Sequence, residues 1–276
     1  MKRNISAIRS IFLVNLFLVF VMGNCSLATM LYGSDSDTGA LYLINGENAE
    51  TELVGYLEIE PTLFYDGILA GLAYDSENDI MYGTTTDTNK LYSIDYVTGK
   101  ATEIGKLNAS LIHGLAYDDS TDTLYGISAD STNNHLYQID VTTGNASIIG
   151  DIGIALIRGL AVHPETYDLY GVTSGRGGLC YLTQIDKNTG NGTLLYEYAS
   201  LNMAGLTFGP DGTLYTTDNW TGNLYTIDLS NGSTHLIGNT GLDNALGLTY
   251  VPEPTTIILL GLGGINFILR RKRKHS

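Results

Sequence analysis

Recurring carboxylates are the side chains of this sequence whose type and spacing could do chemistry. An aspartate falls at the same place in four of five successive repeats of the chain: Asp37, Asp87, Asp130 and Asp218. Asp35 lies two residues before the first of them. Because Ca²⁺ binds roughly six to eight oxygens from carboxylates and carbonyls, such a ring predicts a calcium site, with Asp35 and Asp37 as its first candidate ligands. No acidic run has the spacing of an EF-hand loop, and solvated turn residues are the alternative interpretation.

Three further side chains accompany these carboxylates at the predicted rim of the fold: Trp220, His113 and Arg158. His113 and Arg158 open the first segment of their repeats, where the other repeats have Ala70, Ala204 and Leu246. We expect His113 and Arg158 to be neighbours near a channel mouth and to contribute to a polar binding surface. The alternative for His113 is a rim or core histidine whose ring nitrogens are satisfied within the protein.

The elements that must position these residues come from a sequence repeat. Gly71-Leu72-Ala73-Tyr74 returns in similar form at Gly114, Gly159, Gly205 and Gly247, at intervals of 43, 45, 46 and 42 residues. A near-constant period is typical of an array of identical supersecondary units. Each unit holds four short segments of aromatic and branched residues bounded by Gly, Asp, Asn or Thr, which predicts four strands. Between the third and fourth segments the pattern Asp95 to Gly99 recurs from Asp140, Asp186 and Asp228, and predicts a tight hairpin.

Four-stranded units of this length predict an all-β fold, a five-bladed β-propeller. Residues 67–241 give four complete units, while residues 31–55 supply the last three strands of a fifth unit. The missing first strand is Gly247 to Tyr250. Pairing this C-terminal strand with the N-terminal partial blade closes the ring and leaves no exposed edge at the seam. The alternative is an open stack of β-repeats, which gives no reason to split one unit between the two ends.

Charge is distributed unevenly along the 276 residues. The formal net charge is −15, but residues 29–252 contain six Lys and Arg against 28 Asp and Glu, a net charge of −22. Since nucleic-acid affinity depends on neutralising phosphates with Lys and Arg, this composition excludes a nucleic acid as partner. It favours cations, basic partners or high solubility.

The first 28 residues have the composition of a secretory signal peptide. Lys2, Arg3 and Arg9 are followed by an apolar stretch from Ile11 to Met22 and by the small-residue site Ser26-Leu27-Ala28. An uncleaved anchor is the alternative. After cleavage Cys180 is the one remaining cysteine, which excludes an intrachain disulfide and indicates a buried small side chain. The predicted propeller domain spans residues 29–251.

The last 25 residues, 252–276, combine three features in a fixed order. Pro252-Glu253-Pro254 is followed by fifteen largely apolar residues, Thr255 to Leu269, and by the basic cluster from Arg270 to Lys274. As a helix the apolar run would extend about 22 Å, which is short for a hydrocarbon core about 30 Å thick. We expect a cramped transmembrane helix whose basic end stays in the cytoplasm.

This C-terminal segment resembles the PEP-CTERM sorting signal. The resemblance implies that an exosortase-type membrane protease recognises Pro252, Glu253 and Pro254 and removes the tail behind them. It further implies transient anchoring in the inner membrane, followed by export to the cell envelope, the cell surface or the extracellular matrix. A plain C-terminal membrane anchor is the alternative. The resemblance says nothing about activity.

Two functions remain open from the sequence. The first is a non-catalytic surface or matrix protein that binds polysaccharide or another surface protein, with Trp220, Tyr65 and Tyr198 as exposed aromatic rings for stacking on sugars. The second is a metal-dependent hydrolase or lyase of the propeller-lactonase type. That enzyme would need three or four convergent ligands at the inner ends of the first strands, where Ala70, Ala204 and Leu246 lie instead. There is also no His-Glu-x-x-His and no Gly-x-Ser-x-Gly.

Overall fold

The computed structural model describes residues 29–56, 58–59, 68–129, 134–175, 178–242 and 244–252. Regular structure within these residues is entirely β, in 21 strands that form five sheets. None of these residues belongs to a helix long and apolar enough to cross a membrane. The predicted signal peptide, Glu253, Pro254 and the predicted transmembrane tail lie outside the described residues.

Each sheet is one blade, and we number the blades by the position of their strands in the chain. Blade I contains β21 (Ala245–Tyr250), β1 (Met30–Asp35), β2 (Ala40–Asn45) and β3 (Thr51–Tyr56). Blade II contains β5 (Leu69–Asp75), β6 (Ile80–Thr85), β7 (Lys90–Ile94) and β8 (Lys100–Lys106). Blade III contains β9 (Ile112–Asp118), β10 (Thr123–Ser128), β11 (His135–Ile139) and β12 (Ala146–Asp151). Blade IV contains β13 (Ile157–Val162), β14 (Leu169–Thr173), β15 (Leu179–Ile185) and β16 (Gly192–Ala199). Blade V contains β17 (Met203–Phe208), β18 (Leu214–Asp218), β19 (Asn223–Ile227) and β20 (Thr234–Asn239).

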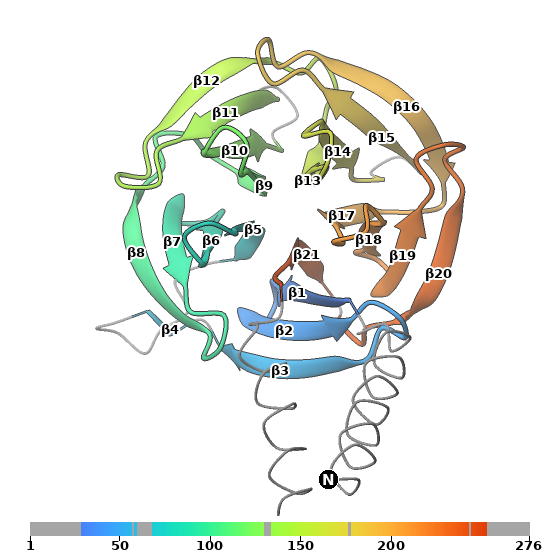
Figure 1. Ribbon diagram of the computed structural model, residues 1–276, viewed down its shortest axis with the longest axis horizontal. Helices are drawn as coiled ribbons and strands as arrows, with labels where there is room; N and C mark the ends of the chain where they lie inside the picture. The colour runs from blue at the N-terminus through green and yellow to red at the C-terminus, as the bar shows by residue number, and fades with distance from the viewer. Residues whose placement is uncertain are drawn as a thin grey trace, which may run out of the picture.

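The five blades stand in a ring, with β5, β9, β13, β17 and β21 innermost and β3, β8, β12, β16 and β20 outermost (Figure 1). The prediction of a five-bladed propeller is therefore confirmed, and so is the closure of the ring by the C-terminal strand. In blade I, β21 pairs antiparallel with β1, with Leu31 opposite Tyr250 and Gly33 opposite Leu248. Joining the two ends of the chain in one sheet leaves no blade with a missing strand.

Hairpins between the third and fourth strands form as the sequence predicted. The carboxylate of Asp95 accepts a hydrogen bond from the backbone N–H of Val97 at 2.9 Å, and Asp140, Asp186 and Asp228 do the same two residues ahead at 2.7–2.8 Å. The glycine four residues after each aspartate has positive φ, between 75° and 79°. Because L side chains rarely adopt this conformation, glycine is the residue that lets the chain turn here.

One strand was not predicted. Residues 58–59 form β4 (Glu58–Ile59), which leaves blade I and pairs parallel with β8, the outer edge of blade II. Figure 1 shows β4 outside β8, so that blade II has five strands where the others have four. Two residues carry no alternating pattern, so this pairing could not be predicted from the sequence.

The core lies between the blades. One cluster packs Tyr82 of blade II on Tyr117 of blade III, with ring centroids 6.0 Å apart, around fully buried Leu91. Hydroxyl groups add hydrogen bonds across three of the interfaces between neighbouring blades, which we call seams. Thr84 Oγ1 donates to the carbonyl of Ile112, Ser34 Oγ to that of Leu69, and Thr217 Oγ1 to that of Ala245, at 3.0–3.1 Å. Neighbouring innermost strands are thereby held side by side around the axis.

Candidate functional site

The axis of the ring is hollow, and its two ends differ. At the end where the innermost strands begin, the space is only about 10 Å³; we call this the narrow end. Where the same strands finish, a cavity of about 240 Å³ opens; we call this the wide mouth. All five blades contribute to its lining, through Tyr74, Tyr117, Val162, Phe208 and Tyr250 among others.

His113 and Arg158 lie at the narrow end. Both line the same small space, as their position in the repeat predicted. His113 donates from Nδ1 to the backbone carbonyl of Leu111 at 2.9 Å, since a carbonyl oxygen can only accept. Beside them Ala70, Ala204 and Leu246 pack together as a buried apolar cluster. With about 10 Å³ of space, the narrow end has room for about one water molecule and for no larger ligand.

Two aspartates of the predicted rim stabilise hairpins between second and third strands. Asp35 and Asp218 are buried, and each accepts a hydrogen bond from the backbone N–H two residues ahead, of Asp37 at 2.9 Å and of Trp220 at 2.8 Å. Asp37 and Asp87 are exposed. Asp130 lies outside the described residues.

Calcium binding by this rim stays a prediction. Among the described residues, no three His, Cys, Asp or Glu side chains come close enough to hold a metal ion together. Asp35 uses one of its oxygens for the turn to Asp37, so these two candidates form a local hairpin contact in this structure. The enzyme hypothesis, which needs such a cluster, also stays a prediction.

Of the three aromatic rings expected at the surface, the structure describes two. Trp220 is exposed over 58 % of its area, as predicted. The prediction for Tyr198 was wrong, since it lies in β16 opposite Cys180 and is 8 % exposed. Most side chains of β16 are exposed or half-buried, but Tyr198 packs in the cluster that contains Cys180, Met203 and Leu206. Cys180 is itself fully buried, which raises the pKa of its thiol to about 11. Tyr65 lies outside the described residues.

Aromatic hydroxyls at the wide mouth are anchored by carboxylates of the loops beside them. Tyr74 and Tyr96 both donate to Asp79 Oδ1, each at 2.6 Å, and Tyr117 donates to Asp122. The hydrogen bonds from the Tyr74 and Tyr96 hydroxyls hold the pKa of Asp79 below its ordinary value. Burial, with the bond to Asp79, raises the pKa of Tyr96 to about 12 and that of Tyr74 further. Tyr74 and Tyr117 are therefore neutral and fixed at the edge of the cavity, and Tyr96 holds Asp79 from the neighbouring hairpin.

Contacts between blades also fix the rim of the wide mouth. The backbone N–H of Ser76 in blade II donates to Asp119 Oδ1 in blade III at 3.2 Å, and the N–H of Tyr250 donates to Thr207 Oγ1 at 3.0 Å. Ser76 and Asp119 are exposed and line the cavity. Pro252 lines it as well, so the first residue of the predicted sorting motif lies at this rim.

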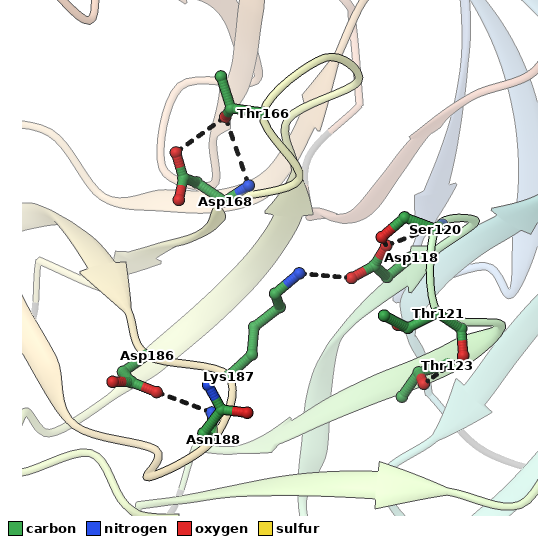
Figure 2. Close-up of polar contacts among 9 residues, drawn as sticks. All are labelled: Asp118, Ser120, Thr121, Thr123, Thr166, Asp168, Asp186, Lys187 and Asn188. Atoms are coloured by element: carbon green, nitrogen blue, oxygen red, sulfur yellow. Dashed lines mark hydrogen bonds and ion pairs between the residues drawn. The ribbon is translucent and has the colours of Figure 1, made fainter.

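An ion pair joins blades III and IV on the same side of the ring (Figure 2). Lys187 Nζ, in the hairpin after β15, lies 2.6 Å from Asp118 Oδ2, and Ser120 donates to Asp118 Oδ1 from both its N–H and its hydroxyl. Burial alone would raise the pKa of Asp118, but Lys187 and Ser120 outweigh it and hold that pKa below its ordinary value. Lys187 also borders a groove of about 440 Å³ with Asp168 and Asn188.

Backbone N–H and C=O groups are the main hydrogen-bonding groups that the wide mouth offers to a ligand. Among the described strands, each innermost strand is hydrogen-bonded to one neighbour in its sheet, so its other edge faces the axis (Figure 1). Backbone N–H and C=O groups along such an edge need partners, from side chains, water or a ligand. Together with Ser76, Asp119 and Thr249 they give a polar surface bordered by aromatic rings, which suits a hydroxyl-rich ligand.

The binding surface predicted from the sequence lies at the other end of the axis, the narrow end. The residue that follows Gly-Leu-Ala or Gly-Leu-Thr lines the wide mouth and is aromatic in four of five repeats: Tyr74, Tyr117, Phe208 and Tyr250. These residues were predicted to pack in the core, and Tyr117 and Phe208 are indeed buried there. The repeat did not reveal which end of the innermost strand borders open space.

Comparison with known proteins gives one motif and one fold. Residues 251–274 match the PEP-CTERM protein-sorting motif. No curated protein sequence matches the chain.

Solved structures with a similar fold include a chain of the nidogen/laminin complex, with 16 % identity, a TM-score of 0.56, and coverage of 80 % of this chain and 97 % of that one. A protein of unknown function from Bacteroides thetaiotaomicron is 14 % identical, with a TM-score of 0.53 and coverage of 82 % of this chain and 66 % of that one. At these identities the likeness concerns the fold alone.

Proposed function

Since the chain has a PEP-CTERM sorting motif, which marks an exported protein sorted to the cell surface through its C-terminal tail, we propose that it is a non-catalytic binding module of the cell surface or extracellular matrix. Its ligand is a polysaccharide, and the wide mouth is the binding site. The single observation that supports this proposal is the polar cavity of about 240 Å³ bordered by Tyr74, Tyr117, Phe208 and Tyr250.

The size of the cavity argues for part of a polymer rather than a free cofactor. Sites for drug-sized ligands enclose roughly 300–1,000 Å³, so a cavity of about 240 Å³ suits an end group or a branch. The half-buried rings of Tyr74 and Tyr250 can contact the apolar faces of sugar rings, whereas Tyr117 and Phe208 are buried in the core. Ser76, Asp119 and backbone groups offer hydrogen bonds to hydroxyls. The acidic body of the protein favours a neutral or basic glycan over an acidic one.

Blocking the wide mouth tests this function. We expect Ser76→Trp to abolish binding to matrix polysaccharide of the producing cell, because the exposed side chain of Ser76 lines the cavity and an indole would fill the opening. Ser110→Trp is the matched control, since Ser110 is equally exposed but lies in the loop before β9, at the narrow end. Binding is measured by co-sedimentation with the purified polysaccharide and on a glycan array.

Two outcomes would contradict the proposal. One is equal binding by the Ser76→Trp and Ser110→Trp variants, which would place the ligand elsewhere on the molecule. The other is no binding of the unaltered protein to any matrix polysaccharide or arrayed glycan. Thermal unfolding of both variants distinguishes a blocked site from a damaged fold.

A further inference from the structure

The fold finishes at the wide mouth. Val251 is buried at 3 % exposure, and the next residue, Pro252, is exposed and lines the cavity with Thr249 and Tyr250. The sorting motif therefore leaves the propeller from the rim of its largest axial opening. It does not leave from an outer strand or from the narrow end.

The distance from this rim to the membrane is limited by the chain itself. Only Glu253 and Pro254 separate Pro252 from the apolar segment that begins at Thr255. Three residue steps of at most about 3.6 Å allow about 11 Å of fully extended chain. While the apolar segment is in a bilayer, the rim at Pro252 must lie within about that distance of its surface.

From this placement we infer that the wide mouth faces the membrane in the uncleaved protein and is open to polymers only after the tail is removed. The inference rests on the proposed insertion of the tail in a membrane, but not on the identity of the ligand. A small molecule can diffuse into a gap of about 11 Å, whereas a globular protein or a coiled or branched polymer that is wider than the gap is excluded from it. Removal of the tail would then both release the protein and make its cavity available.

The charge of the wide-mouth face favours its release from the membrane surface once the tail is removed. Its loops between first and second strands are acidic, with Glu77, Asp79, Asp119, Asp122 and Asp211. The nearby cations are Lys187, which is paired with Asp118, and Lys100, which lies beside Asp95. A face with this charge gains nothing from an anionic bilayer, so the tail alone would hold it at the surface.

Cysteine labelling tests the orientation without any ligand. Ser76→Cys places a thiol at the wide mouth and Ser110→Cys places one on the opposite side, both in a Cys25→Ser background, with Cys180 buried. The full chain is reconstituted in phosphatidylcholine vesicles, where no protease removes the tail. It is then treated with a bulky polyethylene-glycol maleimide or with the small reagent N-ethylmaleimide.

We expect the bulky reagent to label Cys at position 76 several-fold more slowly than Cys at position 110, while the small reagent labels both alike. A second chain with a Gly/Ser linker of about 40 residues between Pro254 and Thr255 should remove the difference, because such a linker extends about 35 Å on average. Equal labelling of the two positions by the bulky reagent in the chain without the linker would overturn the inference. So would a slow reaction at position 76 that persists with the linker. Neither result depends on whether the cavity binds a polysaccharide.

Discussion

Asp118 shows how single residues of this acidic protein are stabilised. Its carboxylate is completely buried, a position that is costly for a charge without partners. Lys187 and Ser120 supply these partners, and Lys187 comes from the neighbouring blade. The pair therefore satisfies a buried charge and joins two blades at the same time.

Lys187→Ala should destabilise the protein by about 1.5 to 3 kcal/mol, the range for hydrogen bonds to charged groups, because it leaves the buried Asp118 without its cation. Urea unfolding at neutral pH measures the loss. Lys106→Ala is the matched control: Lys106 is exposed on β8, and the expected change is within about 0.5 kcal/mol.

The same pair predicts a dependence on acid. Because the pKa of Asp118 is lowered in the fold, its contribution is complete above the pKa of the unfolded chain and is lost as pH falls through the folded-state pKa. In Lys187→Ala the pKa of Asp118 should rise, because a lowering charge and hydrogen bond are lost while burial remains, so acid unfolding should begin at a higher pH than in the unaltered protein. Identical acid-unfolding curves for the two proteins would show that the pair has no such role.

Residue roles set by neighbours in the sequence could be predicted, and those set across blades could not. Asp95 and Asp140 were expected to form hairpins because the groups that they bond lie two residues ahead. Lys187 lies 69 residues from Asp118, and no local pattern links them. Tyr198 was misjudged for the same reason, since its burial depends on the face of β16 that meets blade V.

At the scale of elements, the seams between blades depend on glycines of the outer strands. Gly55, Gly105, Gly150 and Gly238 each approach the hairpin between third and fourth strands of the next blade. At the remaining seam Tyr196 of β16 packs on Gly232 and donates to the carbonyl of Leu229 at 2.9 Å. The glycine that ends the fourth segment of most repeats is therefore a requirement of packing between blades.

Gly150→Ala tests this role. A Cβ at Gly150 would lie 1.9 Å from the backbone oxygen of Thr189, so blades III and IV must separate to admit it. We expect a loss of about 1 to 3 kcal/mol, as for other overpacked contacts, measured by urea unfolding. Ser147→Ala, an exposed position of the same strand, should change stability by less than about 0.5 kcal/mol. Equal effects of the two substitutions would contradict the importance of this contact.

Strand existence and order could be predicted because each blade repeats the same short pattern with the same turn chemistry. The strand β4 could not, because it is defined by pairing with β8 and not by its own two residues. Which end of the axis is open also escaped prediction. It depends on the side chains of five separated strands, small ones such as Ala70 and Ala204 packed with Leu246 at one end and larger rings spread around a cavity at the other.

For the whole molecule, closure of the ring and the position of the sorting motif are linked. β21 supplies buried Ala245, Leu246 and Leu248 to blade I, and buried Val251 follows it directly. The hydrogen bonds between β21 and β1 cover the edge of β1. The Pro-Glu-Pro element of the motif starts at Pro252, the residue after Val251. A protease that cuts behind the motif would therefore leave the ring intact, whereas a cut a few residues earlier would open it.

Two truncations of the chain separate these cases. A chain that ends at Pro252 should unfold at the same temperature as the full chain in detergent, in a single cooperative transition, because every described strand is retained. A chain that ends at Asn244 lacks β21 and exposes β1 as an unpaired edge, so we expect loss of the cooperative transition and aggregation. Calorimetry and limited proteolysis measure both. If the shorter chain melts like the longer one, β21 does not hold the ring closed; if the chain ending at Pro252 is already destabilised, the fold extends into the sorting signal.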